Sequence, residues 1–138
     1  MKDQVLSLHH VALPVSNLER STQFYSRVLL LQEIDRPPFD FRGAWFALGE
    51  GQLHLIERPD GTTRAARPLD SRDVHFAIRI RDFDAMLDHL HSASYDENAP
   101  PADQFRIKAT RHPRAGFPQI FIMDPDRHVI EINAESAD

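Results

Sequence analysis

An internal repeat restricts the fold of this chain more than any other feature. The ten residues from His10 to Glu19 resemble the ten from His75 to Asp84, at an offset close to half of the 138-residue chain. In each copy a histidine begins a strand-like run, which ends at a polar residue and passes into a helical pattern. Because such a repeat is one supersecondary unit, the pattern predicts two structurally similar modules.

A helical pattern follows the strand in each copy of the repeat. In the first copy, Ser16 and Glu19 have the spacing of a capping box. In the second copy, Asp82 is the predicted N-cap of a helix. An apolar stripe at helical spacing follows it and predicts a face packed in the core, made of Phe83, Met86, Leu87 and Leu90.

Three short strand candidates follow each helix and are separated by turn residues. They span 32–35, 43–48 and 52–57 in the first half, and 105–112, 119–123 and 128–133 in the second. Each half therefore has the order βαβββ, and two such modules give an α+β fold with eight strands, mostly antiparallel. We expect a single domain over 1–138, with modules at 5–58 and 73–134 and a linker over 59–72.

Composition narrows the chemistry of the chain. It contains no cysteine, which excludes disulfides and thiolate sites and fits a cytoplasmic protein. It contains eight histidines, so any bound metal is expected to have nitrogen and oxygen ligands. The net charge of −5 argues against nucleic-acid or anionic-membrane partners. The longest apolar run, Ala44–Leu48, predicts neither a membrane-spanning helix nor a signal peptide.

Strand alternation identifies polar side chains that share a face. His10 and His75 occupy equivalent positions and point away from the predicted helices, and His54 and Glu131 form a second equivalent pair, each between apolar neighbours. A buried, unpaired Glu131 would be costly, and a cation bound by it and the histidines removes that cost. The alternative is an ion pair between Glu131 and an arginine such as Arg79 or Arg127.

Substrate contacts are predicted from the same alternation. Arg79 shares the face of His75 and is a candidate clamp for an anionic substrate, with a surface salt bridge as its alternative. Trp45 and Phe121 are candidate pocket-lining residues, although aromatic residues in strands commonly belong to the core.

Four spaced motifs together resemble the vicinal oxygen chelate superfamily, over essentially residues 6–134. They are His10-Val-Ala-Leu-Pro-Val with Phe24-Tyr25, then Gln52-Leu-His54-Leu, Val74-His75-Phe-Ala-Ile, and Asp124-Pro-Asp126 with Val129-Ile-Glu131-Ile. That superfamily includes glyoxalase I, bleomycin- and fosfomycin-resistance proteins and extradiol dioxygenases. The resemblance implies paired βαβββ modules that form a curved, half-open sheet around a metal.

The resemblance also implies the ligands and the chemistry. The metal-ligand positions of the superfamily correspond, position by position, to His10, His54, His75 and Glu131 of this sequence. The position of His54 is glutamate in typical glyoxalase I, so His54 is either a ligand or a partner of a ligand. The implied ion is divalent Zn, Ni, Co, Mn or Fe, to which two adjacent oxygens of the substrate bind as a chelate. Glu131 is the candidate general base.

Two functions remain open at this point. One is a metal-dependent lyase, isomerase or oxygenase that acts on a small oxygen-rich metabolite, and the other is a binding protein that sequesters a small molecule, as bleomycin-resistance proteins do. Retention of all four polar residues favours the enzyme. Members of the superfamily commonly pair their modules within or between subunits, and the resemblance therefore implies a homodimer.

Overall fold

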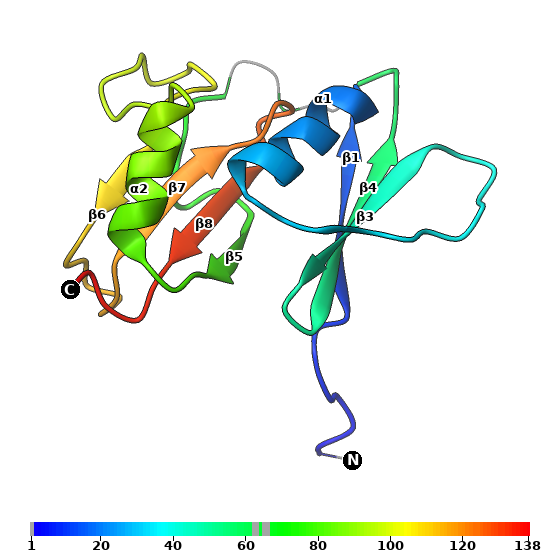
Figure 1. Ribbon diagram of the computed structural model, residues 1–138, viewed down its shortest axis with the longest axis horizontal. Helices are drawn as coiled ribbons and strands as arrows, with labels where there is room; N and C mark the ends of the chain where they lie inside the picture. The colour runs from blue at the N-terminus through cyan, green and yellow to red at the C-terminus, as the bar shows by residue number, and fades with distance from the viewer. Residues whose placement is uncertain (1, 62–63, 65–66) are drawn as a thin grey trace. The chain divides into compact units, whose positions relative to one another are not determined.

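The computed structural model describes residues 2–61, 64 and 67–138, and it divides into two compact units, Met1–Gly61 and Thr62–Asp138 (Figure 1). Part of the predicted linker over 59–72 lies outside the described residues. The α+β class and the two modules are confirmed, since each unit follows the order strand, helix, three strands. Among the described helices, none is long and apolar enough to cross a membrane.

The first unit builds one mixed sheet with the order β1-β4-β3-β2. Strand β1 runs parallel to β4, and the other pairs are antiparallel. One face is apolar, with Phe46, Leu53 and Leu55 fully buried on it, and the ring centroid of Phe46 lies 6.0 Å from that of Tyr25. The elements are β1 (His10–Val15), α1 (Leu18–Gln23), β2 (Glu33–Ile34), β3 (Gly43–Leu48) and β4 (Gly51–Glu57), with a π-helical turn η1 (Phe24–Val28) after α1.

The predicted capping box at the start of α1 is wrong. Asn17, not Ser16, is the N-cap, and its side chain accepts a hydrogen bond from the backbone N–H of Arg20. Glu19 forms an ion pair with Arg42 instead of reaching back to the cap. The extended backbone at Asn17 decides this, because the N-cap is the last non-helical residue before the first turn.

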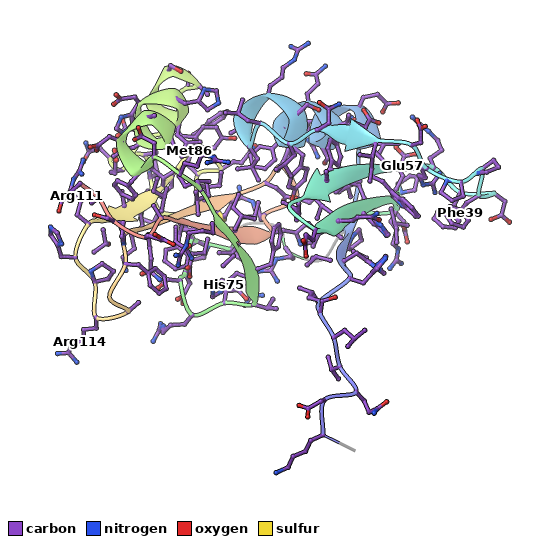
Figure 2. The ribbon with its side chains drawn as sticks, turned by 60° about the horizontal axis from the view of Figure 1, so that its bottom comes forward. Phe39, Glu57, His75, Met86, Arg111 and Arg114 are labelled. Carbon is purple, nitrogen blue, oxygen red and sulfur yellow. The ribbon has the colours of Figure 1, made fainter. Side chains whose placement is uncertain are left out.

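The second unit repeats this plan with the order β5-β8-β7-β6. Strand β5 is parallel to β8, and one face of the sheet is a core of fully buried isoleucines. In Figure 2, Met86 lies on the helix side of this sheet and His75 lies away from that helix. The elements are β5 (His75–Arg79), α2 (Phe83–Ser92), β6 (Lys108–Thr110), β7 (Gln119–Met123) and β8 (Val129–Asn133).

The predicted N-cap of α2 is confirmed, and it provides a stability test. The Asp82 side chain accepts a hydrogen bond of 2.9 Å from the backbone N–H of Ala85. We expect Asp82→Ala to lower the free energy of unfolding by about 1 kcal/mol, because an N–H of the first turn loses its acceptor. Urea denaturation measures this, with Asp88→Ala, an exposed position inside the same helix, as the control. Equal losses in both variants would contradict the capping role.

Candidate functional site

In the second unit, His75 and Glu131 face each other across neighbouring strands. The His75 Nε2 atom lies 3.5 Å from Glu131 Oε1, and His75 Nδ1 lies 2.7 Å from the carbonyl oxygen of Asp73. A carbonyl only accepts, so Nδ1 carries the hydrogen and a neutral ring turns its Nε2 lone pair toward the carboxylate. Two acceptors at this distance repel each other unless a proton or a cation lies between them. The geometry therefore favours a positively charged occupant.

The second oxygen of Glu131 is already held by the protein. Glu131 is only 6% exposed, and Asn133 Nδ2 donates to its Oε2 at 2.6 Å. Arg79 Nε donates in turn to Asn133 Oδ1, so Arg79 reaches the carboxylate only through an amide. Arg127 donates to backbone carbonyls, including that of Ala102. Neither arginine forms the direct ion pair with Glu131 that the sequence left open.

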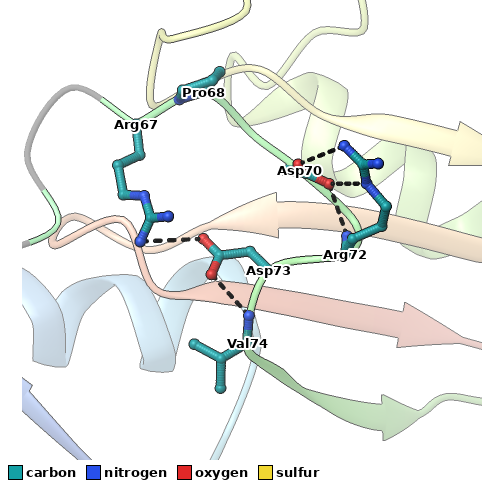
Figure 3. Close-up of a pocket in the computed structure, with 6 residues that line it drawn as sticks. All are labelled: Arg67, Pro68, Asp70, Arg72, Asp73 and Val74. Carbon is teal, nitrogen blue, oxygen red and sulfur yellow. Dashed lines mark hydrogen bonds and ion pairs between the residues drawn. The ribbon is translucent and has the colours of Figure 1, made fainter.

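The segment before β5 positions the carbonyl that orients His75. The Asp73 carboxylate accepts from the backbone N–H of Val74 at 2.8 Å and forms ion pairs with Arg64 and Arg67. Burial alone would raise the pKa of Asp73, but these partners outweigh it and lower the pKa. Figure 3 shows Asp73 in the wall of an open pocket of about 450 Å³, which is lined by Arg67, Pro68, Asp70, Arg72, Asp73 and Val74.

In the first unit, His54 is sandwiched between two rings. Its ring centroid lies 4.1 Å from that of His10 and 3.9 Å from that of Trp45, and both contacts are stacked. Burial lowers the pKa of His54, and the nearby charges of His10, His9 and Arg36 lower it further. The ring is therefore neutral at physiological pH.

The tautomer of His54 follows from its hydrogen bond. Its Nε2 lies 2.8 Å from Gln52 Oε1. An amide oxygen only accepts, so Nε2 donates and Nδ1 keeps a lone pair. Metal-binding histidines commonly hold their second ring nitrogen in this way, and His75 with Asp73 follows the same pattern.

The sheet register places the predicted residues on the expected faces. Ala12 and Trp45 are paired with His54, and Ala77 and Phe121 with Glu131, so His54 and Glu131 are structurally equivalent. The Phe121 ring lies edge-on to His75 at 5.5 Å.

Arg79 and two polar residues close to the candidate ligands in the sequence have different partners. The guanidinium of Arg79 lies 5.1 Å from the Phe117 ring centroid. Glu57 accepts from the backbone N–H of Leu18, the first residue of α1, and is therefore occupied on the helix side of the sheet. His9 contacts His10 through their Nδ1 atoms at 2.9 Å.

Sequence reasoning missed three supporting residues. Gln52 and Asn133 each lie two positions from a candidate ligand on the same strand, so alternation was a signal that could have found them. Asp73 contributes a backbone carbonyl to His75, and no residue type signals that role.

Within the ranges that the structure describes, no three of the His, Asp and Glu side chains gather as a metal-binding group. The structure instead brings together two pairs, one in each unit: His10 with His54, and His75 with Glu131. Each pair offers the neutral imidazole or carboxylate donors that suit a divalent transition metal.

Comparisons with known proteins agree with this fold. The sequence model of the Glyoxalase/Bleomycin resistance protein/Dioxygenase superfamily matches residues 7–132. Two curated relatives are each 27% identical: the uncharacterized protein YwkD of Bacillus subtilis (strain 168), aligned over 91% of this chain and 94% of that protein, and Glyoxylase I 4 of Arabidopsis thaliana, over 91% and 69%.

A solved structure shows the same architecture. It is a mutant of the fosfomycin resistance protein FosX from Listeria monocytogenes, complexed with Mn(II) and 1S,2S-dihydroxypropylphosphonic acid. Its TM-score is 0.71 at 16% identity, with 96% of this chain and 95% of that chain covered. At this identity the likeness shows the fold alone.

Proposed function

Because the chain belongs to the Glyoxalase/Bleomycin resistance protein/Dioxygenase superfamily, we propose that it is a divalent-metal-dependent enzyme acting on a small metabolite with adjacent oxygen atoms. One observation carries this proposal. His75 Nε2 faces the buried carboxylate of Glu131 at 3.5 Å, and both groups are oriented by further hydrogen bonds. A cation beside a buried carboxylate offsets the cost of burying its charge, and the facing imidazole nitrogen is a second donor for such an ion.

The proposed ligands are His10, His75 and Glu131, with His54 as the fourth, and the ion is Zn, Ni, Co, Mn or Fe. The donor set supports this choice, since His75 and His54 keep one lone pair each while their other ring nitrogens are occupied. The FosX structure with Mn(II) shows that a protein of this fold binds such an ion. We propose that the whole chain, 1–138, forms one glyoxalase-like domain that works as a homodimer.

The chain's own residues supply the rest of the chemistry. A bound divalent ion would stabilise negative charge that develops on the substrate oxygens. Glu131 is the proposed general base. Its Oε1 accepts a proton from the substrate, while Asn133 holds Oε2 in place. Arg79 holds Asn133 and is the proposed contact for an anionic substrate group. Trp45 and Phe121 are the proposed apolar walls beside the ligands.

Calorimetric titration with Mn²⁺, Zn²⁺, Ni²⁺, Co²⁺ and Fe²⁺ tests the proposal. We expect about one ion per chain, because each chain supplies one set of the four proposed ligands. The loaded protein is then screened for turnover of α-keto acids, hemithioacetals and catechols, and activity should disappear when the metal is removed. Failure to bind any of the ions would contradict the proposal. Stoichiometric binding of a small molecule without turnover would instead identify a sequestering protein.

A further inference from the structure

His9 is the last residue before β1, at the end of an arm without helix or strand that leads into the first unit (Figure 1). Alternation along a regular strand would place the side chains of His9 and His10 on opposite faces. Instead, their Nδ1 atoms lie 2.9 Å apart, and the two rings meet edge to face with their centroids 5.1 Å apart. The side chain of His9 therefore contacts a proposed metal ligand directly.

Strand β4 holds the backbone of His9 in this place. The backbone N–H of Gln52 donates to the carbonyl oxygen of His9 at 3.0 Å. A Cβ at Gly51 would lie 3.3 Å from the same oxygen, so the glycine allows the arm to approach this closely. The side chain of Gln52 meanwhile accepts from Nε2 of His54. One residue of β4 thus fixes both His9 and the ring of His54, which stacks on His10.

The internal repeat indicates which of the two Nδ1 atoms carries the shared hydrogen. His10 and His75 are the first residues of the equivalent strands β1 and β5. In His75, Nδ1 donates to the carbonyl oxygen of Asp73, and Nε2 faces Glu131. The same arrangement in His10 means that its Nδ1 donates and its Nε2 keeps a lone pair. His9 then accepts through the lone pair of its own Nδ1.

The opposite direction of this hydrogen bond would block His10 as a ligand. If His9 donated, a neutral His10 would carry its hydrogen on Nε2 and would offer no free lone pair to a metal. The other two histidines of the proposed site have their second ring nitrogens held in the required way, by Gln52 and by the carbonyl of Asp73. His9 is the group that holds the second nitrogen of His10.

We propose that His9 is a positioning residue of the candidate metal site, which accepts a hydrogen bond from His10 Nδ1 and thereby presents His10 Nε2 to the ion. The inference rests on the proposed function, because His9 acts through His10 as a metal ligand. His9 is not itself a ligand, since its Nδ1 lone pair is occupied by His10 and its Nε2 carries the hydrogen.

Three variants of the full chain test this role by calorimetric titration with Mn²⁺ and with Zn²⁺. His9→Leu removes the acceptor and should weaken metal binding by about 10- to 100-fold, the usual effect of losing a group that orients a metal-binding histidine. His9→Asn places an amide oxygen close to the position of Nδ1 and should restore the affinity to within about threefold of the wild type. Leu8→Ala, which changes a 75% exposed neighbour in the same arm, is the control and should leave the affinity unchanged.

The position of the hydrogen is measured in the metal-free protein. Long-range proton–nitrogen NMR correlation spectra at about pH 8, where histidine side chains are ordinarily neutral, identify the ring nitrogen that carries the hydrogen. We expect it on Nδ1 of His10 in the wild type and in His9→Asn. In His9→Leu the Nδ1 acceptor is gone, so the hydrogen should move toward Nε2, the form that isolated imidazole side chains prefer.

The possible results separate this inference from the proposed function. Equal metal affinity of His9→Leu and the wild type, or a hydrogen on Nε2 of His10 in the metal-free wild type, overturns the role of His9 and leaves the proposed function intact. His9→Asn binding metal as weakly as His9→Leu, with both variants folded by circular dichroism, also overturns the acceptor role. A wild-type protein that binds neither ion overturns the proposed function together with the inference.

Discussion

Glu131→Gln and His75→Ala are each expected to reduce bound metal from about one ion per chain to less than about a tenth of that, because each removes a direct ligand. The glutamine keeps the shape of Glu131 and can still accept from Asn133, so the loss reports the missing negative charge and not a collapsed strand. Elemental analysis after dialysis measures the metal, and circular dichroism confirms that each variant is folded.

A matched histidine provides the control for this prediction. His91→Ala removes a surface histidine of α2 that pairs with Glu97, and it should leave the metal content unchanged. At saturating metal, Glu131→Gln should also lower kcat by about 10²- to 10⁴-fold, since a general base is lost. Full metal retention in both Glu131→Gln and His75→Ala would exclude them as ligands.

Ile132→Ala is expected to lower the free energy of unfolding by about 2–5 kcal/mol, because it leaves a cavity in a closely packed sheet core. Ile132 is fully buried on β8, next to Glu131, and it pairs with Ile78 and Ile120 on the flanking strands. The milder Ile132→Val should cost about 0.5–1.5 kcal/mol, since most of the side chain remains.

Urea denaturation measures both isoleucine variants. Val74→Ala is the control, because Val74 is 76% exposed and its truncation should change stability by less than about 0.5 kcal/mol. A loss for Ile132→Ala no larger than for Val74→Ala would mean that this face of β8 contributes little to the core. A loss of stability that is larger for Ile132→Ala than for Ile132→Val would instead show that packing of Ile132 in the core stabilises the strand that carries Glu131.

The sequence by itself determined the order of the strands and helices and the faces of the strands, whereas it did not predict the π-helical turn η1 and gave 105–112 for the shorter strand β6. Strands β3 and β7 have the predicted bounds, 43–48 and 119–123, and Asp82 caps α2 as its position predicted. Alternation along β4 also places Glu57, which meets α1, on the opposite face from His54. These features are local, because side chains alternate along any strand and a cap needs only the next few residues.

Only the tertiary structure decided which groups each candidate residue meets. Glu131 had two arginines as possible partners in the sequence, yet it accepts from Asn133 and faces His75. His9 gave no signal, since alternation places it on the face opposite His10, and its contact with His10 depends on the arm that Gln52 holds. Such pairings depend on strand register and loop conformation, where several partners compete, so no local pattern predicts the one that forms.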